Sequence, residues 1–144
     1  MKSKIKIESL LGVGIMLFFF FLSYGTYAQT QPKGKPWPAP ETAVKMKSPV
    51  AANAENIAEG KTLYTKHCKS CHGASGKGDG TKAANLDISC GDFTTEEFKN
   101  ETDGTIYWKT TEGRDPMPSF KKKVSDEERW QIVAYVRTLE PKKK

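Results

Sequence analysis

Apolar residues at helical spacing dominate the C-terminal two-thirds of the chain. After Asn53, whose side chain can cap a helix, apolar or small residues recur at intervals of three or four. They are Ile57, Gly60, Tyr64 and Cys68. This pattern predicts a first helix with one apolar face, and that face ends at a cysteine.

Two further helices are predicted in the middle of this region. The first begins at Thr94, which forms a capping box with Glu97, and it includes Phe98. The second begins near Asp103 and ends at Gly113, a residue type common just beyond helix ends. Its apolar residues are Ile106, Tyr107 and Trp108.

The last predicted helix has the clearest signals at its two ends. Ser125 and Glu128 form a capping box at its start, and Pro141 stops it. Its apolar face is lined by Ile132, Val133, Val136 and Leu139. No segment shows the apolar–polar alternation of a half-buried strand, so the sequence predicts an all-α domain of about four helices.

The N-terminal residues 1–28 have the composition of an export signal. They combine a start with three lysines, an apolar run of thirteen residues from Leu10 to Leu22, and a small-residue cleavage site at Ala28. We therefore expect a signal peptide and a periplasmic or otherwise extracytoplasmic location. An uncleaved membrane anchor is the alternative.

Residues 29–52 contain five of the eight prolines and show neither a helical nor a strand period. This composition predicts an extended, semi-rigid linker. The folded domain is then expected over residues 53–144, including a short basic tail. A chain of 144 residues, 37% of them hydrophobic, is enough for one small core of this kind.

The stretch Cys68-Lys69-Ser70-Cys71-His72 is the main candidate for chemistry. A thioredoxin-type redox dithiol would need a strand–helix–strand context, which is not predicted here. A structural zinc could use the two cysteines, His72 and the distant Cys90, but the adjacency of Cys71 and His72 would strain it. Covalent haem attachment is the third interpretation, and Cys-x-x-Cys-His is its recognised pattern.

Covalent haem attachment gives both cysteines and the histidine of this pattern a role. One helical turn separates Cys68 from Cys71, so both thiols can form thioethers on one side of a porphyrin. His72 follows at once and can reach the iron as a neutral imidazole. We therefore predict one covalent c-type haem, attached through Cys68 and Cys71, with His72 as an axial iron ligand.

The second axial ligand must come from elsewhere in the chain. His67, the other histidine, adjoins the attached edge, and three of the four methionines fall in the signal segment or the linker. This leaves Met117, which stands between two prolines that stiffen its loop. A core methionine at a turn is the alternative role.

The Cys68 to His72 stretch, the Met117 loop and the two terminal helices together resemble the single-haem cytochrome c family, in its small bacterial form. The resemblance covers roughly residues 53–140. It implies that the first and last helices cross closely at Gly60, and that the glycine-rich segment 73–80 turns tightly below the haem.

Cys90 stands outside this pattern. With the other two thiols attached to haem, it is left unpaired in an oxidising compartment. A buried inert residue, an intermolecular disulfide and a reactive thiol all stay open as its role.

The charge distribution favours a redox protein as partner. The formal net charge is +6. Exposed lysines near the attachment stretch and the Met117 loop can steer an acidic partner, or simply form a solvated face. They are Lys69, Lys77, Lys121, Lys122 and Lys123. Nucleic acid is not expected for an exported chain, and membrane contact is expected only if the N-terminal segment stays uncleaved.

The resemblance implies electron transfer, not catalysis. Because both axial positions are filled, no iron position is open to a substrate, and we expect a one-electron carrier that is not an enzyme. A methionine ligand raises the reduction potential relative to histidine pairs. Two alternatives stay open: an electron-transfer subunit of a larger dehydrogenase or oxidase, and a haem enzyme or gas sensor in which Met117 is labile.

Overall fold

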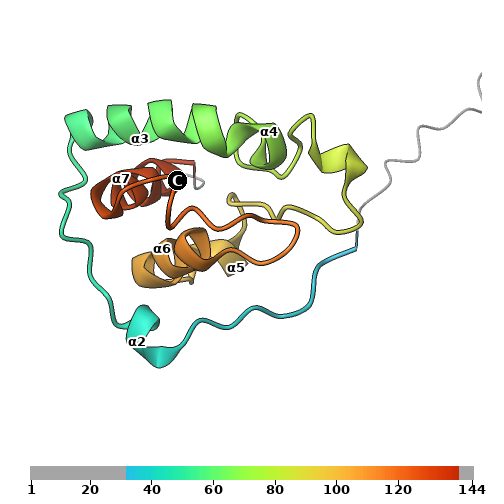
Figure 1. Cartoon of the computed structure of the whole chain (residues 1–144), viewed down its shortest axis with the longest axis horizontal. Helices are drawn as coiled ribbons and strands as arrows, with labels where there is room; N and C mark the ends of the chain where they lie inside the picture. The colour runs from blue at the N-terminus through green and yellow to red at the C-terminus, as the bar shows by residue number, and fades with distance from the viewer. Residues whose placement is uncertain (1–31, 140–144) are drawn as a thin grey trace, which may run out of the picture. The chain divides into compact units, whose positions relative to one another are not determined.

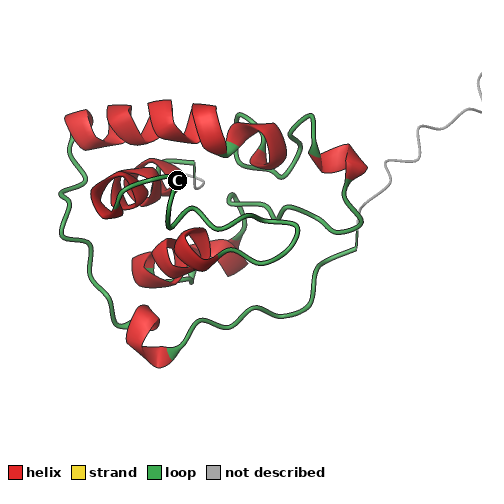
Figure 2. Ribbon diagram, viewed as in Figure 1, coloured by secondary structure: helices red, strands yellow, loops and turns green. Residues whose placement is uncertain are grey.

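The computed structural model describes residues 32–139, and helices are the only regular elements in this range. Figure 1 shows their arrangement, and Figure 2 shows that loops join them. They are α2 (Glu41–Val44), α3 (Ala54–His67), α4 (Lys69–His72), the 3-10 helix η1 (Ala83–Asn85), α5 (Glu96–Lys99), α6 (Asp103–Glu112) and α7 (Asp126–Arg137). The all-α prediction is confirmed. The predicted signal segment, residues 1–28, lies outside the described residues.

Within residues 32–139, no helix has both the length and the apolar character needed to cross a membrane.

The three longest helices begin and end close to where the sequence predicts. Asn53 caps α3, because its side chain accepts a hydrogen bond from the Asn56 backbone N–H at 2.9 Å. Helix α6 ends at Gly113, which has a φ of +68°. At the start of α7, the Ser125 N–H donates to the Glu128 carboxylate at 2.7 Å, and the Glu128 N–H donates to the Ser125 hydroxyl at 3.3 Å. The predicted capping box is therefore confirmed.

Helix α5 begins one residue later than predicted. Both the N–H and the hydroxyl of Thr94 donate to the Asp92 carboxylate, at 2.7 and 2.6 Å, so Thr94 closes a turn and is not a cap. Thr95 caps the helix instead, and accepts from the Phe98 N–H at 3.3 Å. The hydrogen bonds to Asp92 thus occupy Thr94, the residue that the sequence pattern assigned to the cap.

Helices α3 and α7 lie side by side and cross with their backbones in contact (Figure 1). A Cβ atom placed on Gly60 of α3 would lie 2.0 Å from the Gln131 carbonyl oxygen of α7. Next to this point the rings of Tyr64 and Tyr135 pack with their centroids 5.2 Å apart. The close crossing that the sequence implied is therefore confirmed, and only glycine fits at position 60.

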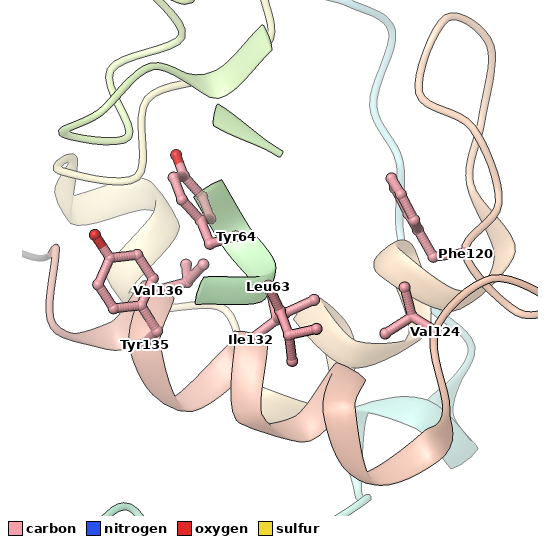
Figure 3. Packing of buried hydrophobic residues seen from close by; sticks show 7 residues of the cluster. All are labelled: Leu63, Tyr64, Phe120, Val124, Ile132, Tyr135 and Val136. Carbon is pink, nitrogen blue, oxygen red and sulfur yellow. The ribbon is translucent and has the colours of Figure 1, made fainter. Parts of the chain in front are cut away.

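The main apolar cluster lies along this crossing (Figure 3). Helix α3 contributes Leu63 and Tyr64, and the segment before α7 adds Phe120 and Val124. Helix α7 completes it with Ile132, Tyr135 and Val136. The cluster therefore joins the helix that precedes the cysteines to the segment that follows the Met117 loop.

A second apolar cluster joins α6 to α7. Its buried members are Ile106, Tyr107, Trp130 and Val133. The rings of Tyr107 and Trp130 are nearly parallel, at 8°, with their centroids 4.2 Å apart. Helix α7 thus presents one side to each cluster, and the single apolar face predicted for it is divided between two partners.

A buried arginine fixes the segment that leads into α7. Arg129 is only 2% exposed, and its guanidinium donates to the backbone carbonyls of Lys121 and Val124. It also donates to the Tyr107 hydroxyl at 3.1 Å and pairs with Asp126. A buried guanidinium with this many acceptors ties α6, α7 and the intervening segment together.

The proline-rich segment is packed against the domain, which differs from the linker predicted for residues 29–52. Ala43 of α2 is buried. A Cβ atom placed on Gly104 of α6 would lie 2.0 Å from the Ala43 carbonyl oxygen. Upstream, the rings of Trp37 and Trp108 have centroids 6.0 Å apart. Proline content predicted the irregular backbone before α2, but it carries no information about contacts so distant in sequence.

The crossing of α3 and α7 can be tested with Gly60→Ala. Alanine should add about 1 kcal/mol of helix propensity, but its methyl group would overlap a backbone carbonyl that cannot turn away. We expect a net loss of about 2 kcal/mol in the free energy of unfolding, measured by guanidinium denaturation. The exposed Lys61→Ala on the same helix is the control and should be close to neutral; equal stability of the two variants would contradict the described crossing.

Candidate functional site

The two cysteines and the histidine occupy one tight helical turn directly after α3. Cys68 ends α3 and begins α4, and its carbonyl accepts from the N–H groups of Cys71 and His72, at 3.1 and 3.0 Å. The predicted separation of one helical turn between Cys68 and Cys71 is therefore present in the structure.

A glycine-rich loop satisfies the backbone carbonyls of this turn. The carbonyls of Ser70, Cys71 and His72 accept from backbone N–H groups farther along the chain. The donors are Lys82 at 2.8 Å, Gly80 at 3.1 Å and Gly78 at 2.9 Å, in the same order. A Cβ on Gly80 would lie 2.4 Å from the Ser70 oxygen, so glycine is required for this approach. The loop is a brace for the cysteine turn, and this close approach explains its glycine content.

Tyr64 fixes the chain where it leaves the turn. Its ring is 1% exposed, and its hydroxyl donates to the Gly73 carbonyl at 2.7 Å. Burial is the main reason that the pKa of the Tyr64 hydroxyl is raised, so it stays a proton donor. The sequence identified Tyr64 as a helix-packing residue and did not reveal this second contact.

The imidazole of His72 is half-buried and neutral. It stacks on Phe93 with ring centroids 4.6 Å apart, and burial lowers its pKa to about 4. The backbone of Cys90 acts in the opposite direction and raises the pKa of His72. No partner among the described residues completes a hydrogen bond to the buried Nδ1 atom. A neutral imidazole is the form that binds a metal ion.

The three cysteines are free thiols in the described structure. Burial, followed by the neighbouring Cys71 thiol, raises the pKa of Cys68 to about 12. Partial burial and Cys71 also raise the pKa of Cys90, which places these two thiols close enough to interact. Among residues 32–139, no group of three or more His, Cys, Asp or Glu side chains is arranged to hold a metal ion.

Met117 lies in a loop that folds back on itself between α6 and α7. The backbone N–H groups of Arg114 and Met117 each donate to the other residue's carbonyl, at 2.9 and 2.7 Å. The half-buried Met117 side chain packs against the main apolar cluster, and so does that of Cys68. His67, the other histidine, lies edge-on to Phe120 with ring centroids 6.0 Å apart.

Comparison with known proteins identifies the family. A family model described as Cytochrome c matches residues 57–140. The chain belongs to the cytochrome c family. No curated protein matches it.

Two solved structures resemble this cytochrome c chain. A chain of the Kuenenia stuttgartiensis reducing HAO-like protein complex Kustc0457/Kustc0458 is 34% identical, with a TM-score of 0.60. That match covers 75% of this chain and 52% of the other, so the present chain spans about half its length. The KustC0563 c-type cytochrome is 31% identical, with a TM-score of 0.51, and the match covers 57% of this chain and 98% of that one.

Membership of the cytochrome c family implies a covalently bound c-type haem and electron transfer through its iron. The donor set described above fits such a group. Two thiols stand one turn apart, and beside them a neutral imidazole has a buried nitrogen without a partner among the described residues. A thioether packs on the same apolar cluster as the first of these thiols.

The brace around the cysteine turn can be tested with Tyr64→Phe in this cytochrome c. The change leaves the buried Gly73 carbonyl without its donor and should lower the free energy of unfolding by about 1–3 kcal/mol. Tyr135→Phe, which removes a hydroxyl from the neighbouring ring, is the matched control and should cost less than about 0.5 kcal/mol. Thermal unfolding of both variants measures the difference, and equal losses would contradict the role given to the Tyr64 hydroxyl.

Proposed function

We propose that this cytochrome c is an extracytoplasmic one-electron carrier with a single haem, attached through Cys68 and Cys71 and ligated by His72 and Met117. One observation supports this most directly. Met117 and Cys68 are far apart in sequence, yet both pack against the same apolar cluster. A thioether from one end of the domain and the attachment turn from the other are thereby available to a single cofactor.

Each residue has a defined task in this proposal. When bound, the haem supplies an iron that accepts and releases one electron. The half-buried His72 provides a neutral nitrogen ligand, because removal from water disfavours its charged form. Met117 provides a soft thioether, which favours the reduced metal and raises the reduction potential. With both positions occupied by the chain's own side chains, no position is left for a substrate, so we propose a carrier and not an enzyme.

The proposed partners are redox proteins with acidic docking faces. The five lysines near the attachment turn and the Met117 loop are exposed: Lys69, Lys77, Lys121, Lys122 and Lys123. Positive charge at such a surface speeds the encounter with an acidic partner, and salt weakens it. The extracytoplasmic location rests on the composition of residues 1–28.

A second candidate function is that of an electron-transfer subunit in a larger complex. It is favoured by the 34% identity to a chain of a reducing HAO-like protein complex. The two candidates use the same site and differ in partner binding. A subunit should copurify with its complex at high salt, whereas a carrier should be recovered alone once about 0.5 M salt screens its surface charges.

Haem attachment can be tested by replacing both Cys68 and Cys71 with Ala. The wild-type band should keep a haem stain through denaturing electrophoresis, and the double variant should lose it, because no thioether remains. Cys90→Ala removes the third thiol and should keep the stain. A stain that persists in the double variant would contradict the assigned attachment.

The axial role of Met117 can be tested with Met117→Ala. The haem should stay attached while the reduction potential falls by on the order of 0.1 V, a fraction of the roughly 0.8 V range that axial ligands span. Cyanide and carbon monoxide should also bind readily. Met46→Ala, at an exposed methionine, is the control and should leave the spectrum and the potential unchanged. Identical spectra and potentials for Met117→Ala and wild type would favour the enzyme or sensor alternative.

A further inference from the structure

Residues 32–37 run along the domain as a strap with a contact at each end and one between. At one end, the Pro32 carbonyl accepts from the Ser89 N–H at 3.1 Å. Lys33 then pairs with Glu97 of α5 at 2.8 Å. At the other end, the Trp37 ring packs on Trp108 of α6. The family match begins at residue 57, so this strap lies outside it.

The strap holds the side chain of Arg114. The guanidinium lies over the Trp37 ring, with its central carbon 4.6 Å from the ring centroid. It also donates from Nη1 to the Pro36 carbonyl at 3.1 Å. A guanidinium that lies over an indole ring and also donates to the adjacent carbonyl is restrained by two contacts at once.

The contacts that hold Arg114 also restrain the backbone of Met117. The Arg114 backbone forms both hydrogen bonds of the bridge with Met117, so the two residues move together. Gly113 precedes them at a φ of +68°, and a Cβ there would lie 2.4 Å from the Ser119 nitrogen. The base of the loop is therefore closed on α6, and the strap contact acts on its outer part.

We propose that the strap is a positioning device for the Met117 loop, acting through Trp37 and Arg114 to slow dissociation of the methionine thioether from iron. This inference rests on the proposed ligation by Met117. The strap contacts Ser89, the residue before Cys90, as well as Arg114 beside Met117. It therefore links the segment that contains Cys90 to the Met117 loop.

The experiment compares four variants of the haem-loaded full chain. Trp37→Ala and Arg114→Ala each break the contact, and the double variant tests whether they act together. Trp37→Phe keeps an aromatic face and should restore part of the restraint. Lys35→Ala, an exposed strap residue, is an additional control that removes the same charge as Arg114→Ala.

Two readouts separate the strap from the ligand assignment. The first is hydrogen exchange at the Met117 amide, with the Val136 amide of the α3–α7 core as an internal reference for global opening. The second is the rate of cyanide binding to the ferric protein, together with the weak far-red absorption of a methionine–iron bond.

We expect Trp37→Ala and Arg114→Ala each to speed Met117 exchange and cyanide binding about tenfold or more, with the Val136 amide unchanged. The double variant should match the single ones, and Lys35→Ala should match wild type. Met117 exchange at the wild-type rate, or equal acceleration at Val136, would overturn the proposal. So would unchanged cyanide binding in a protein that shows the far-red band. If wild type lacks that band while Met117 exchange still responds, the strap is supported and the ligand assignment fails.

Discussion

The contact between the backbones of α3 and α7 at Gly60 positions the segments that carry the cysteine turn and the Met117 loop. Because no side chain separates the helices there, Tyr64 and Tyr135 meet directly beside the crossing. The C-terminal end of α3 carries the cysteine turn, and the chain before α7 carries the Met117 loop. A wider crossing would move these two segments apart. The geometry of the site therefore depends on the absence of a side chain at Gly60.

The surroundings of the cysteine turn are held mainly by backbone groups. Three successive carbonyls of the turn accept from the N–H groups of residues 78, 80 and 82, and the Tyr64 hydroxyl adds a hydrogen bond to the Gly73 carbonyl. Backbone hydrogen bonds of this kind survive most substitutions of the side chains involved. They require glycine where two segments of backbone lie too close for a side chain. Close backbone contact explains Gly78 and Gly80, and the positive φ angles of Gly73 and Gly76 explain the other two.

Features set by nearby residues could be predicted from the sequence, and features set by distant ones could not. The helices α3, α6 and α7 follow from local caps and apolar spacing, and the one-turn spacing of the cysteines follows from the helix itself. The cap of α5 was assigned one residue early because Asp92 binds Thr94. The docking of Trp37 on Arg114 and the burial of Arg129 depend on partners that no local pattern reveals. The ligand role of Met117 stays a prediction from composition and loop chemistry.

The division of α7 between two apolar clusters has a consequence for the order of events during synthesis. Ile132 and Val136 complete the cluster on α3, while Trp130 and Val133 complete the one on α6. Neither cluster can close before α7 has been made, although the cysteine turn emerges much earlier. Both clusters are therefore completed only when the last helix is present, and loss of α7 would open them together.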